Sequence, residues 1–156
     1  MRSTDNGSSF DNVTSPIETN LYGITFGNNT FVGVGTDGKI VRSTDNGSSW
    51  DNATSGISQQ FQGITFGNNI FVTVGDNAVL TSDNTSTWFE RDSGATGTLY
   101  GINYGNSIFI TFQYKTIYTS SDGITWTNQT SFSSSSLYKF SPPKYLACPI
   151  DFLPVM

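Results

Sequence analysis

The chain of 156 residues is long enough to bury a hydrophobic core, and a single domain over residues 1–156 is the default expectation. Its net charge of -5 argues against a nucleic-acid partner, because phosphate-binding surfaces depend on Lys and Arg. The sequence has no histidine and one cysteine, Cys148, which excludes His-dependent triads, His-bound zinc and an intrachain disulfide. No run of about 18 apolar residues predicts membrane insertion. We expect neither a metal nor a cofactor.

The most informative feature is an internal repeat. The segments "LYGITFGNN", "FQGITFGNN" and "LYGINYGNS" begin at Leu21, Phe61 and Leu99, so the unit recurs after 40 and then 38 residues. A period of this length is typical of stacked supersecondary units.

Within the first unit, apolar residues recur with a period of two rather than 3.6. Tyr22, Ile24 and Phe26 alternate with small or polar residues, and "GNN" then interrupts the pattern. The further segments rich in β-branched or aromatic residues are 31–34, 39–43 and 48–51. They are separated by Gly, Asn and Asp, which favour turns. The pattern predicts four short strands per unit and no helix of useful length.

Four antiparallel strands repeated about every 40 residues predict an all-β fold of the β-propeller type, with a β-solenoid as the structural alternative. The expected complete blades are residues 17–54, 55–92 and 93–130. Residues 1–16 resemble the outer hairpin of a further blade, and residues 131–156 resemble its inner strands and a tail. The chain would then hold four blade equivalents, with one blade shared between its N- and C-termini. A homo-oligomer that completes a larger ring and a fragment of a longer protein are the alternatives.

The turn before the predicted fourth strand contains a recognisable motif. Asp45 is placed to accept backbone N–H bonds, Gly47 tolerates a positive φ, and Trp50 sends a large apolar ring between blades. Together with Ser43 and Ser49, these residues resemble the Asp-box, or BNR repeat, of sialidases and sortilin-type receptors. The other copies of the motif contain Asp5, Asp83 with Trp88, and Asp122 with Trp126. The resemblance implies a propeller in which these residues are structural and peripheral, and it implies little about function, because the repeat occurs with unrelated activities.

The loops joining second to third strands are the predicted binding face. Their candidate contact residues are Asp37, Lys39, Asp76, Asn77, Tyr114 and Lys115. Short polar side chains with an occasional tyrosine suit repeated hydrogen bonding to a glycan or a protein surface. We therefore expect a non-catalytic interaction or structural module.

The enzymatic alternative is a fragment or remnant of a sialidase-like or other propeller glycoside hydrolase. The resemblance implies three substrate-binding arginines in a sialidase, but Arg2, Arg42 and Arg91 all lie in or beside the Asp-containing hairpins. Asp37 and Asp76 remain conceivable as an acid pair, although turn positions explain both. We predict that the chain is not an enzyme.

Seven asparagines lie in Asn-x-Ser/Thr sequons: Asn6, Asn12, Asn28, Asn46, Asn52, Asn84 and Asn128. Their density is compatible with N-glycosylation and with an extracellular or cell-surface location. The polar start "MRSTDNGSS" does not have the pattern of a signal peptide.

Overall fold

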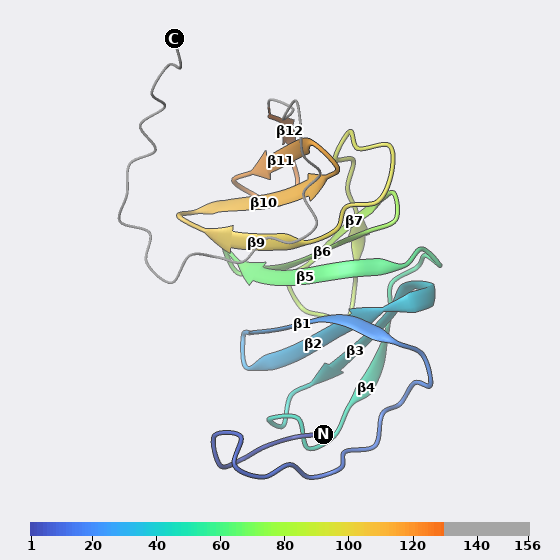
Figure 1. The fold of residues 1–156 in the computed structure, drawn as a ribbon, viewed down its shortest axis with the longest axis vertical. Helices are drawn as coiled ribbons and strands as arrows, with labels where there is room; N and C mark the ends of the chain where they lie inside the picture. Colours follow the sequence, from blue (N-terminus) through green and yellow to red (C-terminus); the bar gives the residue numbers. More distant parts are fainter. Residues whose placement is uncertain (130–156) are drawn as a thin grey trace.

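Three four-stranded antiparallel sheets follow one another along residues 1–129, the part of the chain that the computed structural model describes (Figure 1). The first sheet is β1 (Leu21–Gly27), β2 (Thr30–Gly35), β3 (Lys39–Ser43) and β4 (Asp51–Thr54), with a short 3-10 turn at Thr36–Gly38. The second is β5 (Phe61–Gly67), β6 (Ile70–Gly75), β7 (Ala78–Ser82) and β8 (Phe89–Glu90). The third is β9 (Ile102–Gly105), β10 (Ile108–Gln113), β11 (Thr116–Ser120) and β12 (Thr127–Asn128). Each sheet pairs its strands in chain order, and the segment 131–156 predicted for the closing blade lies outside the described residues.

The "GNN" breaks are two-residue hairpin turns. Asn28 and Asn29 connect β1 to β2 with φ values of 44° and 55°, and Asn68 and Asn69 connect β5 to β6 with φ values of 47° and 61°. Positive φ at both central residues is the conformation that matches the twist of a hairpin, and asparagine tolerates it better than most residues. The predicted interruption is therefore the device that fixes strand register.

The fourth strand of the first sheet begins later than predicted. The expected segment was 48–51, but β4 spans Asp51–Thr54. Ser48 and Ser49 belong to the preceding turn, because their backbone N–H groups donate to the main-chain oxygen and the carboxylate of Asp45, respectively. The prediction was wrong because the alternation of residue types does not show that Asp45 already accepts hydrogen bonds from the backbone N–H groups of Ser48 and Ser49.

Glycines allow the sheets to approach closely. A Cβ atom on Gly27 would lie 2.1 Å from Cγ of Phe66, and one on Gly67 would lie 2.1 Å from Cγ of Tyr104. An aromatic ring of the following sheet therefore packs directly against each of these glycines. Nearer the start of the innermost strands, a Cβ on Gly23 would lie 3.1 Å from Cα of Gly63, so the backbones of β1 and β5 are almost in contact there.

The hydrophobic core lies between sheets rather than within one. One buried cluster joins Val32, Val34 and Ile40 of the first sheet to Phe61 and Ile64 of the second. A second cluster repeats this arrangement between the second and third sheets. Each unit is thus stabilised mainly by its neighbours, as expected for a repeat architecture.

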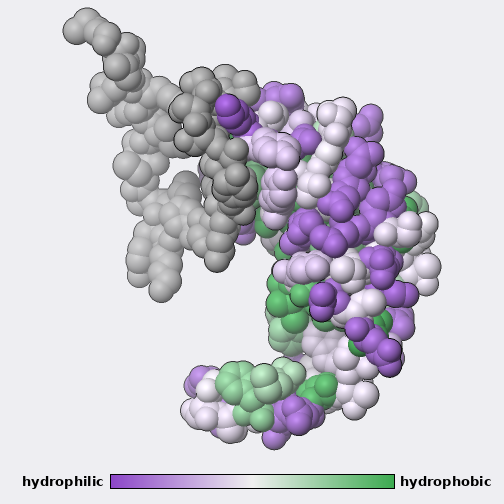
Figure 2. Space-filling view, turned by 45° about the vertical axis from the view of Figure 1, so that its right-hand side comes forward, coloured by the Kyte–Doolittle hydropathy of each residue, from purple (hydrophilic) through white to green (hydrophobic). Residues whose placement is uncertain are grey.

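The N-terminal segment packs as an outer hairpin that precedes the first sheet. Arg2 forms an antiparallel bridge with Asp11, which repeats the pairing of Arg42 with Asp51 found 40 residues later. Arg2 Nη1 also donates to Ser48 Oγ of the first sheet, just as Arg42 Nη1 donates to Ser86 Oγ of the second. The Arg2–Asp11 hairpin therefore contacts the first sheet in the way that the β3–β4 hairpin contacts the second. In the space-filling view residues 1–129 form an arc, with apolar surface facing its hollow (Figure 2).

Candidate interaction face

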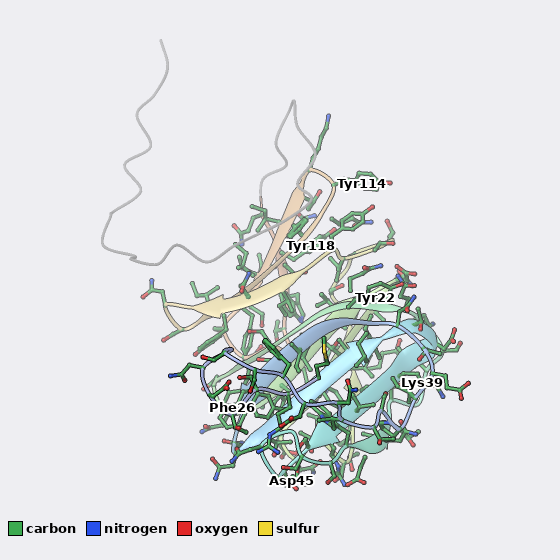
Figure 3. The ribbon with its side chains drawn as sticks, turned by 60° about the horizontal axis from the view of Figure 1, so that its bottom comes forward. Tyr22, Phe26, Lys39, Asp45, Tyr114 and Tyr118 are labelled. Atoms are coloured by element: carbon green, nitrogen blue, oxygen red, sulfur yellow. The ribbon has the colours of Figure 1, made fainter. Side chains whose placement is uncertain are left out.

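The β2–β3 connections lie at one end of the sheets, and the β1–β2 hairpin turns lie at the other. The register pairs Leu21 with Gly35 and Gly27 with Thr30, so the start of β1 lies at the same end as the β2–β3 connection. Figure 3 shows Tyr22, Lys39 and Tyr114 along one side and Phe26 and Asp45 toward the other. We call the first end, which carries Tyr22 and the connections around Asp37, Asp76 and Tyr114, the loop face.

The six predicted contact residues share the loop face but not one cavity. Asp37 and Lys39 line an open depression of about 730 Å³ together with residues 52–59. Asn77 lines a separate depression of about 380 Å³ beside β8. Tyr114 and Lys115 lie at the β10–β11 turn of the third sheet and are exposed. The structure therefore distributes these residues over the three described sheets.

Asp76 is a structural link in the second sheet. Its Oδ1 atom accepts a hydrogen bond of 2.9 Å from Thr98 Oγ1, and its backbone N–H donates to the Gln60 carbonyl at 2.8 Å. These bonds tie the β6–β7 connection to the segments that precede β5 and β9. Asp37 is exposed on another sheet with a φ of 55° and does not share a cavity with Asp76. The two carboxylates therefore lie on different sheets and have different surroundings.

Each of the three arginines makes its own contacts on the described sheets and hairpin. Arg2 and Arg42 donate to serines of successive turns, as described above, and Arg91 Nε donates to Thr81 Oγ1 at 2.9 Å. The Arg91 guanidinium also lies 5.4 Å from the centre of the Phe89 ring. Their contacts stabilise the periphery of the sheets.

A groove along the innermost strands was missed by the sequence analysis. It has a volume of about 320 Å³, and its lining includes Tyr22, Gln62, Tyr100 and Asn103. The first three are the second residue of each repeat, so aligning the repeats by position could have revealed them. The groove contains no charged side chain among its lining residues.

Aromatic side chains extend this groove toward the loop face. The Tyr100 ring lies edge-on to the Tyr114 ring at a centroid distance of 5.8 Å and lies 6.2 Å from the Phe112 ring. Tyr22 and Tyr114 are both exposed. Tyrosine combines a large apolar area with a polar tip, which suits recognition of another chain.

The turns that contain the predicted motif satisfy their own backbone. The carboxylate of Asp45 accepts from Ser49 N–H at 2.9 Å and from Ser49 Oγ at 2.7 Å, and Ser43 Oγ accepts from Gly47 N–H at 2.8 Å. Asp5 repeats these contacts with Ser9 in the N-terminal hairpin.

Hydrogen bonds to the ionised form lower the pKa of these carboxyl groups. The hydroxyl and backbone N–H of Ser9 lower the pKa of Asp5 from 3.8 to about 2. The backbone N–H and hydroxyl of Ser49 hold the pKa of Asp45 well below its usual range. In the third sheet, the backbone N–H groups of Thr125 and Ile124 lower the pKa of Asp122.

The equivalent turn of the second sheet corrects one predicted residue. Asn84, and not Asp83, accepts the backbone N–H bonds, from Ser86 at 2.9 Å and Thr87 at 3.0 Å. These bonds match those of Asp122 with Ile124 and Thr125. The prediction favoured Asp83 because it assumed a carboxylate, whereas an amide oxygen accepts the same bonds.

The indole groups of this motif are held in two of the turns. The Nε1–H of Trp88 donates to the Thr85 carbonyl at 3.3 Å, and that of Trp126 donates to the Gly123 carbonyl at 3.2 Å. Trp88 is buried against the first sheet, whereas Trp50 is only half-buried. Trp126 packs against the cluster between the second and third sheets and is also only half-buried.

Within residues 1–129, no group of three or more Asp, Glu, Cys or His side chains is placed to hold a metal ion. None of the helical segments in this part of the chain is long and apolar enough to cross a membrane.

Stacked four-stranded antiparallel sheets whose innermost strands approach one another define a β-propeller fold, which confirms the predicted fold class. YCF48 from Cyanidioschyzon merolae is similar, with a TM-score of 0.63 and 22% identity over 74% of this chain and 41% of that chain. A structure of YCF48 bound to D1 peptide gives a TM-score of 0.62 at 21% identity, covering 72% of this chain and 42% of that chain. The WD40 β-propeller domain of Doa1 gives a TM-score of 0.60 at 13% identity, covering 76% and 43%.

The chain therefore spans less than half the length of these propellers. No protein-family model and no curated protein sequence matches it.

Proposed function

We propose that this chain is a non-catalytic protein-interaction module that binds an extended peptide segment along the groove of the innermost strands. The observation that carries the proposal is the convergence of Tyr22, Gln62 and Tyr100 from three sheets on one uncharged groove at the loop face. Because the lining offers aromatic rings and amides without charges, we expect a segment rich in uncharged polar and aromatic residues. The YCF48 structure with a bound D1 peptide supports the view that this fold accommodates a peptide.

A short-peptide display library tests this proposal. Selected peptides should bind the full chain, and Tyr22→Ala and Gln62→Ala should each weaken binding by about fivefold or more, which corresponds to about 1 kcal/mol of lost contact. Phe89→Ala is the matched control, because Phe89 is an exposed aromatic residue on β8 outside the groove. Peptides that bind all variants equally would contradict the assignment to the groove.

A glycan array distinguishes the other partner class predicted from the sequence. Glycan binding lost in Asp37→Ala and Lys39→Ala, with no peptide selected, would move the site to the 730 Å³ depression of the first sheet. We favour a protein partner because the groove lining is uncharged, aromatic and amide-bearing, whereas that depression carries the charged Asp37 and Lys39 and no aromatic side chain among its lining residues.

We further propose that the four Asp- or Asn-centred turns are Asp-box repeats and that the protein acts at a cell surface or outside the cell. In each turn an Asp or Asn side chain accepts a backbone N–H bond, from the residue four positions on at Asp5 and Asp45 and from the residue two positions on at Asn84 and Asp122, which supports the first assignment. All seven sequon asparagines are exposed, which supports the second. Mass spectrometry of the natural protein would argue against a secreted location if every sequon were unmodified.

A further inference from the structure

We propose that the first-sheet face, formed by Leu21, Ile24 and Phe26 of β1, binds residues 130–156 of a second copy of this chain. Ile24 also lines the peptide groove, whereas Leu21 and Phe26 do not. The proposal does not depend on the peptide groove, since it concerns a different partner and rests on the exposure of the whole face.

The face differs from two equivalent faces of the same molecule. Leu21 is 43% exposed, whereas Phe61 and Leu99 at the same repeat position are fully buried. Ile24 is 63% exposed, whereas Ile64 and Ile102 are each 7% exposed. The equivalent residues are buried because the preceding sheet covers them. The first-sheet face has the same apolar residues, but no described sheet covers it, so it is an exposed apolar patch.

The N-terminal hairpin limits the size of a partner that can bind this face. The Arg2–Asp11 hairpin already contacts the first sheet through the bond from Arg2 to Ser48. Between this hairpin and the first sheet lies a cavity of about 210 Å³, whose lining includes Val13, Leu21, Ile24 and Trp50. A complete blade would collide with the hairpin, so the space suits two strands equivalent to β1 and β2.

The chain contains a matching sequence outside the described residues. The segment 145–148, "YLAC", has the pattern of "FVGV" at 31–34 and "FVTV" at 71–74. In this alignment Cys148 corresponds to Val34 and Val74, both fully buried. Val34 packs in one cluster with Ile64, the equivalent of Ile24 in the next sheet. The alignment therefore predicts that Cys148 lies beside Ile24 when the segment is docked.

The arc formed by residues 1–129 favours a second copy as the source of this segment. The N-terminal hairpin and β12 lie at opposite ends of the molecule (Figure 1). A match that covers 74% of this chain covers only 41% of the YCF48 chain, so the matched part of this chain corresponds to less than half of that chain, and a second copy would supply a comparable length. Two copies would each supply the segment that completes the other's first blade, an isologous C2 arrangement in which residues 130–156 of each copy contact the first sheet of the other.

Disulfide trapping in the full chain tests the proposal. Ile24→Cys should form a disulfide with the native Cys148 of another copy under mild oxidation, giving a covalent dimer on a non-reducing gel. Mass spectrometry of mixed ¹⁴N- and ¹⁵N-labelled protein should find the 24–148 crosslink between differently labelled chains.

Leu21→Cys is the second variant if Ile24→Cys folds poorly. Ile124→Cys is the matched control, because Ile124 is 46% exposed on a turn of the third sheet. Adding Cys148→Ser should abolish the crosslink.

Light scattering gives an independent measurement. The unmodified chain should have the mass of two copies, and Ile24→Asp should raise the dimer dissociation constant by at least about tenfold by placing a charge in an apolar contact. A 24–148 disulfide within one chain would overturn the second-copy assignment and show that the ring closes in a single molecule. Absence of the crosslink in both cysteine variants, or a monomer at every concentration, would overturn the proposal itself.

Discussion

The segments 23–29 and 63–69 have the same seven residues, "GITFGNN", which end β1 and β5 and form the turns after them, yet the two strands lie in different environments. Both form the first strand of a sheet and end in the same hairpin turn. However, Ile64 is buried in a core cluster with the first sheet, whereas Ile24 is largely exposed. The comparison teaches that local sequence specifies strand and turn here, while the preceding unit supplies the burial that stabilises them.

The largest difference should come from the tryptophans of the two sheets. Trp88→Ala removes a buried indole from between the first and second sheets, so it should lower the free energy of unfolding by about 3 to 5 kcal/mol. Trp50→Ala should cost less, because Trp50 is only half-buried beside the cavity of the N-terminal hairpin. Urea denaturation of both variants measures the difference. An equal loss for the two would mean that the first sheet is covered as fully as the second.

The two isoleucines of the identical segment test the comparison directly. Ile64→Ala should lower the free energy of unfolding by about 2 to 5 kcal/mol through the cavity that it leaves. Ile24→Ala should change the stability of the dissociated chain by no more than about 0.5 kcal/mol, since the side chain is exposed there. Denaturation at high dilution isolates this effect from self-association. A large loss for Ile24→Ala at high dilution would contradict the exposed position of β1.

The glycines that end the first strands extend the comparison to the third sheet. Gly67→Ala should cost about 1 to 3 kcal/mol, because its Cβ would collide with the Tyr104 ring. Gly105→Ala should be nearly neutral, because Gly105 is exposed and no described atom lies within 4 Å of an added Cβ. Thermal unfolding of the pair provides the measurement. A similar fall in Tm for both variants would show that Gly105 also has a close neighbour.

The sequence predicts much of this fold because strand and turn signals are local. The alternation in 21–26 and the paired asparagines correctly predict β1 and its hairpin, since both depend on residues a few positions apart. The start of β4 could not be predicted in this way, because Asp45 draws Ser48 and Ser49 into the turn. The exposure of Ile24 also escapes a local pattern, since Ile64 has the same neighbours in sequence but not in space.

The candidate site was less accessible to sequence analysis. The loop residues, such as Asp37 and Asn77, do lie on one face, but their pattern does not indicate that they line different depressions. Tyr22, Gln62 and Tyr100 lie 38 to 40 positions apart and converge only when the glycines beside them allow the innermost strands to approach. The groove forms only when three units stack, so the sequence of a single unit does not predict it.

The smallest expected effect is an acid dependence that distinguishes the carboxylate turns from the amide turn. The pKa of Asp45 is lowered in the folded chain, so its carboxylate stabilises the fold fully above its unfolded pKa. That contribution should be lost as the pH falls from about 3.8 toward the folded value, which for the equivalent Asp5 is about 2. Asp45→Asn keeps an acceptor oxygen, as Asn84 does in the second sheet, but cannot titrate.

Urea unfolding at neutral pH and in this acid range measures the dependence. The stability difference between the unmodified chain and Asp45→Asn should shrink as the pH falls, and Asn84→Asp should introduce a new acid-sensitive component of the same sign. Thr44→Asn is the control, because Thr44 is an exposed polar neighbour in the same turn. If the difference between the unmodified chain and Asp45→Asn stayed constant through this pH range, the hydrogen bonds would stabilise the turn without favouring the ionised carboxylate. Asp45 and Asn84 would then be energetically equivalent despite their different charge.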